Sequence, residues 1–155
     1  DPAFNSDAMS VNEAQATIKS IRRHTERLAT GTVVSNDASV RELTDWAQQA
    51  RATGSRAAAG TAMHDLHFSF SRDLEKRGLL VNRRLDTPGQ SSNYRVPDFQ
   101  LVDPSYSPPR PMAAWDLKAT GVNEYSHWGS DQFTGIRQAT GIRTIPLYYQ
   151  LPPLR

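Results

Sequence analysis

The spacing of apolar residues changes at Gly78, and this change limits the possible folds more than any other feature of the sequence. Up to Gly78, apolar residues recur every three to four positions, which is typical of helices with one buried side. After Gly78 they form short runs rich in branched and aromatic residues, which are typical of strands. The expected helices cover residues 11–29, 38–52, 57–77 and 129–140. The expected strands cover residues 79–85, 94–102, 112–119 and 142–151. This order indicates an α+β (α/β) fold built on a small sheet.

Composition excludes several classes of protein and site. The 155 residues contain no cysteine, so a disulfide framework, a thiolate zinc site, an iron–sulfur cluster and a cysteine nucleophile are excluded. The longest apolar runs are a few residues long, far below the roughly 18 that a membrane span needs, and we expect no membrane insertion. The sequence also lacks the glycine motifs of serine hydrolases and of proteins that bind nucleoside triphosphates or dinucleotides.

The basic residues are of a kind that suits phosphate. The net charge is only +2, but 15 of the 18 basic residues are arginine and the isoelectric point is about 9.2. A guanidinium group can pair two phosphate oxygens at once, and an isoelectric point above 9 is one sign of a nucleic-acid partner. The same composition also fits a chain from a GC-rich genome that has no such partner.

Two short motifs place acidic and basic groups on neighbouring strands. Pro97 and Asp98 lie in one expected strand, and Asp116, Leu117 and Lys118 lie in the next. Side chains alternate along a strand, so Asp116 and Lys118 share a face. If the two strands pair, the side chains of Asp98 and Asp116 can lie close together. A divalent cation commonly compensates the repulsion between two such carboxylates. Mg²⁺ would supply an activated water, and Lys118 could orient that water or neutralise charge on a phosphate oxygen. A surface salt bridge on a hairpin is the plainer alternative.

These motifs resemble those of the PD-(D/E)XK nuclease superfamily, which has the restriction-endonuclease fold. The resemblance implies a mixed central sheet flanked by helices in a nuclease core over residues 57–155, with residues 1–56 as an N-terminal helical extension. It implies a metal-dependent endonuclease that hydrolyses phosphodiester bonds in DNA, with Asp98, Asp116 and Lys118 as catalytic residues. The resemblance also implies Mg²⁺, or else Mn²⁺ or Zn²⁺, on the carboxylates. A helix before the first strand often adds one acidic ligand in this family. Asp65 is the best match, although the family more often has Glu there, and Asp73 and Glu75 are weaker options.

A small domain of this kind without cysteine also resembles the C-terminal toxin modules of bacterial polymorphic and contact-dependent toxins. That resemblance implies a cognate immunity protein as partner. It also implies export from the producing bacterium as part of a larger protein, with action in the cytoplasm of the target cell. The chain begins with Asp1 rather than Met, and we expect it to be a piece of a longer protein.

Several further residues are candidates for contacts with nucleic acid. Arginines near the expected cleft can hold phosphates, aromatic residues can stack on bases, and glutamines can make substrate contacts or support the site. The arginines are Arg83, Arg84, Arg95 and Arg137, with Arg143 close by. The aromatic candidates are Tyr125, His127 and Trp128, and the glutamines are Gln132 and Gln138.

The sequence leaves three alternatives open. An RNase of the same fold that cuts tRNA would have the same motifs. No residue of the sequence can be identified as a contact to the 2′-hydroxyl group of RNA, so the sequence does not decide between the two substrates. A non-catalytic module that binds nucleic acid or protein would use the basic N-terminal helices without turnover. His64 and His67 have a spacing that can bind zinc, but no second histidine pair accompanies them, so we interpret them as surface histidines.

Overall fold

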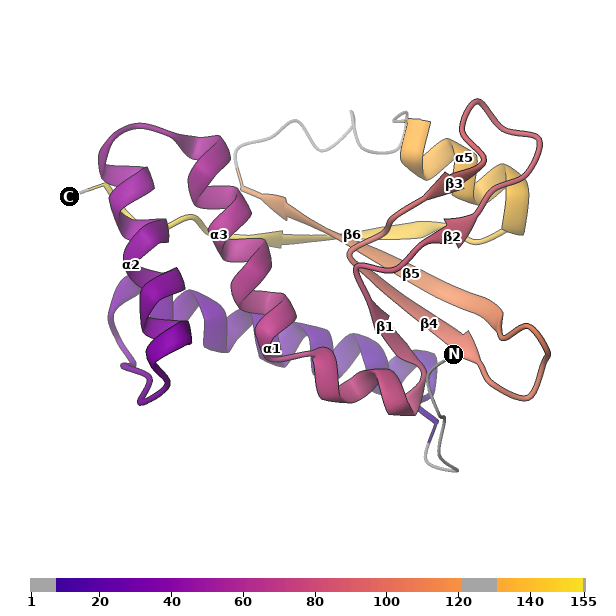
Figure 1. Cartoon of the computed structure of the whole chain (residues 1–155), viewed down its shortest axis with the longest axis horizontal. Coiled ribbons are helices and arrows are strands. Elements are labelled where there is room, and N and C mark those ends of the chain that lie inside the picture. Colours follow the sequence, from indigo (N-terminus) through magenta and orange to yellow (C-terminus); the bar gives the residue numbers. More distant parts are fainter. Residues whose placement is uncertain (1–7, 121–130, 155) are drawn as a thin grey trace.

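The computed structural model describes residues 8–120 and 131–154 of the chain (Figure 1). The helices are α1 (Val11–Thr30), α2 (Ala38–Ala52), α3 (Arg56–Ser69), the short 3-10 helix η1 (Arg72–Arg77) and α5 (Asp131–Thr140). The strands are β1 (Leu79–Val81), β2 (Leu85–Asp86), β3 (Tyr94–Arg95), β4 (Phe99–Asp103), β5 (Arg110–Ala119) and β6 (Thr144–Tyr149). Helices precede the sheet, as the change of apolar spacing at Gly78 predicts.

Four of the strands form one mixed sheet in the order β1-β4-β5-β6. The pairs β1–β4 and β4–β5 are antiparallel, whereas β6 runs parallel to β5. A parallel neighbour needs a crossover, and α5 lies within it (Figure 1). β2 and β3 form a separate two-stranded ribbon. The predicted α+β fold with a small mixed sheet is therefore confirmed.

The first three helices begin at capping residues that the sequence supplies. The side chains of Ser10, Asp37 and Ser55 each accept a backbone N–H bond from the first turn of α1, α2 and α3. α1 ends at Gly31, whose φ of 82° is the left-handed conformation that glycine adopts without strain. α1 and α2 consequently match their predicted bounds to within one residue.

Two predicted elements are interrupted where a side chain or the backbone offers an alternative to regular pairing. The predicted helix 57–77 stops at Ser69, because the Ser71 hydroxyl donates a 2.6 Å hydrogen bond to the carbonyl oxygen of His67. η1 follows as a separate turn. The predicted strand 79–85 divides at Asn82, whose positive φ of 53° turns the chain out of the sheet.

The predicted strand 94–102 is also divided. Tyr94 and Arg95 pair with β2, whereas β4 begins at Phe99 and belongs to the main sheet. Pro97 lies between the two parts and has no N–H to give to a ladder. The division places Asp98 immediately before β4, where its backbone N–H and its side chain are free to bond outside the regular ladder.

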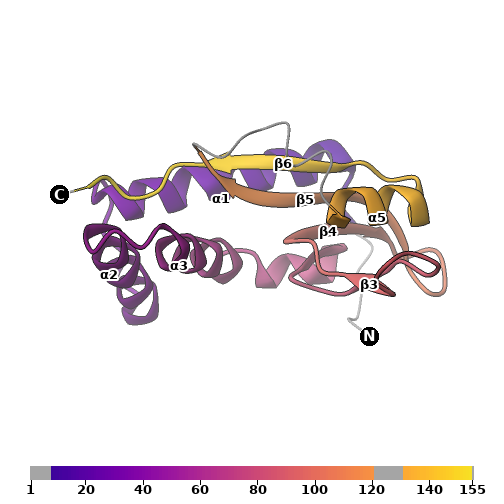
Figure 2. The same cartoon turned by 90° about the horizontal axis from the view of Figure 1, so that it is seen from above.

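One face of the main sheet is apolar and packs on the N-terminal helices (Figure 2). Its buried residues belong to one core together with Ile18 and Leu28 of α1 and Met63 and Leu66 of α3. The strand residues in this core are Leu79, Val81, Phe99, Leu101, Trp115, Leu117, Leu147 and Tyr149. Residues 1–56 and 57–155 thus share a core.

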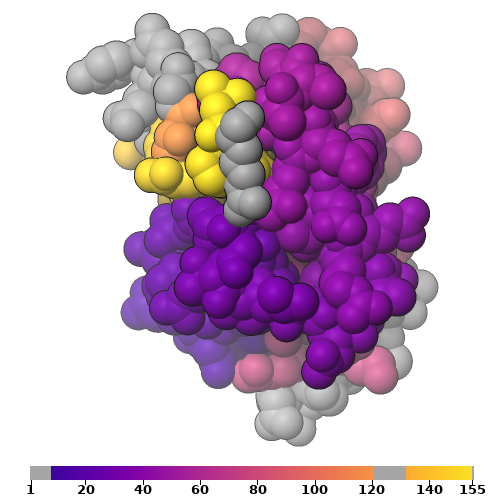
Figure 3. Space-filling view, turned by 90° about the vertical axis from the view of Figure 1, so that its left-hand side faces the viewer, coloured from indigo at the N-terminus to yellow at the C-terminus, as the bar shows by residue number. Residues whose placement is uncertain are grey.

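The C-terminal end of the chain closes this core on the side of the first helices. The residues after β6 lie against α2 and α3 (Figure 3). Arg51 Nε donates to the carbonyl oxygen of Pro152 at 3.2 Å, and Glu26 accepts the backbone N–H of Gln150 at 3.1 Å. Segments from both ends of the chain therefore hold the same layer together.

The opposite face of the sheet is largely polar, although it is also buried. Gln100, Ala114, Asp116 and Thr144 are at most 3% exposed, and the strand pairing places them side by side. α5 covers this face beside β3 and β6. Buried apolar residues of the cover, such as Ile136, lie outside the main core.

Candidate functional site

Asp98 and Asp116 are held together by reciprocal hydrogen bonds across β4 and β5. The backbone N–H of Asp98 donates to Asp116 Oδ1 at 3.0 Å. The backbone N–H of Leu117 donates to Asp98 Oδ2 at 2.7 Å. Each carboxylate is thereby fixed by a backbone amide of the other segment. The structure thus brings together the two aspartates that the sequence places on adjacent strands.

Asp116 is a buried acid beside a second acid. It is 2% exposed, and its pKa is raised above the usual value by burial first and by the charge of Asp98 second. Hydrogen bonds from the backbone of Asp98 and from Gln132 oppose this shift, as does the charge of Lys118. Burial and the neighbouring acid therefore both disfavour the ionised form of Asp116.

Gln132 connects α5 to the carboxylate pair. Its Nε2 donates to Asp116 Oδ2 at 2.5 Å, so both oxygens of Asp116 accept a hydrogen bond. This contact orients the carboxylate from the layer above the sheet. Gln132, a candidate for a substrate or supporting contact in the sequence, is a supporting residue in the structure.

Lys118 lies on the same face of β5 as Asp116, two residues further along the strand. It is partly buried, and its charge lowers the pKa of Asp116. Among the described residues, its ammonium group forms no hydrogen bond or ion pair. A partly buried ammonium with this freedom is suited to an anionic substrate.

The α3 residue that reaches the pair is His64. Its Nδ1 lies 3.5 Å from Asp98 Oδ1, and its ring packs edge-on against Tyr149 and Phe68. In the described residues, Asp65 does not join either aspartate in a group that could hold a metal ion. Successive residues of a helix point about 100° apart, so only one of these two neighbours can face the pair. The i, i+4 spacing of Gly60 and His64, with a small residue that leaves room for Tyr149, is the signal that could have identified this face.

His67 is a core residue, and its interpretation as a surface histidine is wrong. It is fully buried, because it lies one turn from Met63 on the side of α3 that packs on the sheet. Its Nδ1 bonds to the carbonyl oxygen of Met63 at 2.7 Å, whereas Nε2 has no partner among the described residues. Burial lowers the pKa of His67 to about 4, so the ring is neutral at physiological pH. His64 is partly exposed.

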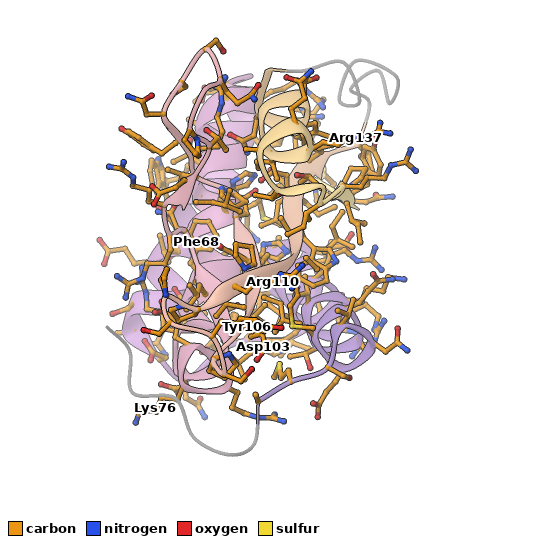
Figure 4. The ribbon with its side chains drawn as sticks, turned by 90° about the vertical axis from the view of Figure 1, so that its right-hand side faces the viewer. Phe68, Lys76, Asp103, Tyr106, Arg110 and Arg137 are labelled. Carbon is orange, nitrogen blue, oxygen red and sulfur yellow. The ribbon has the colours of Figure 1, made fainter. Side chains whose placement is uncertain are left out.

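The four arginines proposed for phosphate binding lie in different surroundings. Arg83 pairs with Glu75 at 2.9 Å, and Arg84 pairs with Asp86 at 2.9 Å while it covers the ring of Tyr94. Arg95 lies under α5, where a Cβ added to Gly135 would be 3.4 Å from its Nε. Arg137 is exposed on α5, well apart from Asp103, Tyr106 and Arg110 at the tip of the β4–β5 hairpin (Figure 4).

The aromatic residues proposed to stack on bases lie outside the described residues. They are Tyr125, His127 and Trp128.

The carboxylate pair fits a hard divalent cation. It offers only oxygen ligands, and Mg²⁺ is typically held by one or two carboxylates together with waters and substrate phosphates. The described ranges contain no group of three or more His, Cys, Asp and Glu side chains that could hold a metal, so the other ligands would be waters and substrate. An oxygen-only set suits Mg²⁺ or Mn²⁺ better than Zn²⁺.

No family model matches the chain, and no curated protein or solved structure matches it significantly. The geometry of the site therefore carries the functional argument. In the part of the chain that the structure describes, no helix has both the length and the apolar character needed to cross a bilayer.

Proposed function

We propose that this chain is a metal-dependent endonuclease that hydrolyses phosphodiester bonds in DNA. The observation that carries the proposal is the reciprocal bonding of Asp98 and Asp116 on adjacent strands, with Lys118 on the same face. The order of elements also agrees with the resemblance to the PD-(D/E)XK superfamily. α3 precedes three antiparallel strands, and a helix and a parallel strand follow them.

Asp98 and Asp116 would hold the divalent cation. When it is bound, such an ion polarises a phosphoryl oxygen and lowers the pKa of a bound water. The residues of the chain supply the remaining functions. Gln132 and the backbone amides of Asp98 and Leu117 fix the carboxylate oxygens, and His64 supports Asp98 from α3.

Lys118 would act on the phosphate itself. Its ammonium group extends from the same face as Asp116 and can stabilise the negative charge that develops on a phosphoryl oxygen during attack. It is one of only three lysines in a chain that otherwise uses arginine. The two others, Lys19 and Lys76, are exposed on α1 and η1 and provide matched controls.

The direct test is cleavage of a supercoiled plasmid by the purified chain in Mg²⁺, with and without EDTA. We expect wild-type chain, Lys19→Ala and Lys76→Ala to cut the plasmid, and Lys118→Ala and the EDTA samples to leave it intact. Plasmid cleavage that EDTA and Lys118→Ala leave unchanged would contradict the proposed mechanism. Total tRNA in a parallel reaction separates DNase from RNase, and salt-sensitive binding without turnover of either substrate would identify a binding module.

The biological role that we propose is that of an interbacterial toxin held inactive by a cognate immunity protein. In this role the domain is exported as part of a larger protein and acts on DNA in the cytoplasm of the target cell. Expression of the wild-type chain inside a bacterial host should then stop growth, while Lys118→Ala at the same protein level should not. Equal growth of the two strains would argue against toxicity through cleavage.

A further inference from the structure

A pocket lies between α5 and the start of β6, on the face of the sheet that carries Asp116. It is lined by Phe133, Thr134, Arg137, Gln138, Arg143 and Thr144, and its volume is about 370 Å³. Pockets of roughly 300–1,000 Å³ are typical of small-ligand sites. The pocket is therefore large enough for one nucleotide unit.

A buried hydroxyl in the lining of this pocket has no partner. Thr144 is 1% exposed, and its Oγ1 forms no hydrogen bond to any described residue. A buried hydroxyl without a partner destabilises the fold, because it has lost its hydrogen bonds to water. The presence of a polar residue at this buried position is explained if a ligand supplies the missing hydrogen bond to Thr144.

The charge of the lining favours an anion. Arg137 and Arg143 both contribute to it, and none of the six lining residues is acidic. The side chain of Arg137 forms no hydrogen bond or ion pair with the described residues, and it is exposed on α5. Gln138 adds an amide that can donate to oxygen. The guanidinium group of Arg137, together with a hydroxyl and an amide, forms a set of donors that suits a phosphate.

The strand register places the pocket next to the proposed catalytic pair. Thr144 pairs with Ala114, which is two residues before Asp116 on the same face of β5. Two residues of a strand span about 7 Å. α5 also joins the two places, because Gln132 bonds to Asp116 and Arg137 lies further along the same helix. One nucleic-acid strand can therefore occupy both.

We infer that this pocket binds a backbone phosphate of the substrate strand, adjacent to the phosphodiester bond that is cut. The inference rests on the proposed nuclease function. It assigns to Arg137 a contact with phosphate and to Thr144 a hydrogen bond to the same nucleotide. The pocket would thus fix the position of the strand over Asp98 and Asp116 without reading its sequence.

The test measures binding in EDTA, where no metal-dependent cleavage interferes. A fluorescent DNA duplex is titrated with wild-type chain, Arg137→Gln, Thr144→Val and the control Arg23→Gln at several salt concentrations. Arg23 is exposed on α1, which packs on the other face of the sheet. Loss of one phosphate contact reduces the slope of log K against log salt by about 0.9.

We expect Arg137→Gln to bind about five- to tenfold more weakly and with this smaller slope. We expect Thr144→Val to bind more weakly with an unchanged slope, and Arg23→Gln to match wild type. Wild-type affinity and slope for Arg137→Gln would overturn the inference. Plasmid cleavage in Mg²⁺ tests the nuclease function separately. If wild-type chain cuts but Arg137→Gln binds normally, only the pocket assignment fails. If no cleavage occurs but Arg137→Gln reduces the slope, the phosphate site is supported and the nuclease fails.

Discussion

The two faces of the central sheet are both buried, but they differ in what they bury. The face toward α1 and α3 presents residues such as Trp115 and Leu117, which pack in the main apolar core. The face toward α5 presents Gln100, Asp116 and Thr144, of which Gln100 and Thr144 each retain a polar atom with no partner among the described residues. Alternation along β5 assigns neighbouring residues to opposite faces.

This difference separates stability from function within a single strand. Apolar burial stabilises the fold by roughly 25 cal/mol per Å², whereas a buried acid beside another acid reduces stability unless a charge or ligand compensates it. Natural sequences keep such costly groups mainly at functional sites. Substitutions on the two faces of β5 should therefore affect stability and activity in opposite ways.

The largest effect is expected from Asp116→Asn. Removal of the charge should reduce the rate of DNA cleavage by roughly 10³-fold or more, because a cation ligand is lost. The free energy of unfolding should stay the same or rise, because the repulsion from Asp98 disappears. Plasmid cleavage and urea unfolding of the same sample check both parts, with Asp45→Asn on the exposed side of α2 as control. If Asp116→Asn lost stability as well as activity, the polar face would also stabilise the fold, and the proposed contrast between the two faces would be wrong.

Leu117→Ala tests the apolar face at the next position. Leu117 is 1% exposed within the main core, and its truncation should lower the free energy of unfolding by about 2–5 kcal/mol. The cleavage rate per folded molecule should remain within a few-fold of wild type, because the backbone N–H that supports Asp98 is kept. A loss of less than about 1 kcal/mol in urea unfolding would show that this face is not the stabilising one.

His67 makes the apolar face sensitive to acid. Its pKa is lowered to about 4 in the fold from 6.5 in the unfolded chain, so the unfolded state binds more protons between these values. The contribution of His67 to the free energy of unfolding is complete above pH 6.5 and is lost as the pH falls toward 4. The contribution lost between pH 7.5 and pH 5 is about 2 kcal/mol. Urea unfolding at both values should show a smaller pH dependence in His67→Gln. An equal dependence in the two proteins would place the acid sensitivity elsewhere.

The smallest effect is expected from Thr144→Val on the polar face. Valine has nearly the same shape and removes the hydroxyl that lacks a partner, so the free energy of unfolding should rise by about 1 kcal/mol. Thermal or urea unfolding without nucleic acid measures this gain. A destabilised variant would mean that the hydroxyl is already bonded in the free protein.

The apolar spacing was sufficient to predict most of the fold, because burial on one side dominates the formation of α1, α2, β5 and β6. Its errors arise where local polar bonding or backbone geometry prevails over apolar spacing. Ser71 ends α3, Asn82 ends β1, and Pro97 separates β3 from β4. The Ser71 hydrogen bond and the Asn82 conformation appear only in the folded chain, whereas the missing N–H of Pro97 is a property of the sequence.

The site was predictable only where it depends on local strand geometry. The pairing of Asp98 with Asp116 follows from strand alternation, which is a short-range property. The choice between His64 and Asp65 depends on the rotation of α3 over the sheet, and the burial of His67 depends on the same rotation. The contact of Gln132 with Asp116 requires the position of α5, which strand patterns do not specify.

The most direct test of the central claim is the position of Mn²⁺ in crystals soaked with the ion, determined from its anomalous diffraction. The account predicts one anomalous peak within coordination distance of carboxylate oxygens of both Asp98 and Asp116, and its loss in Asp116→Asn crystals of the same form. Wild-type crystals that diffract well and show no peak between these two side chains would contradict it.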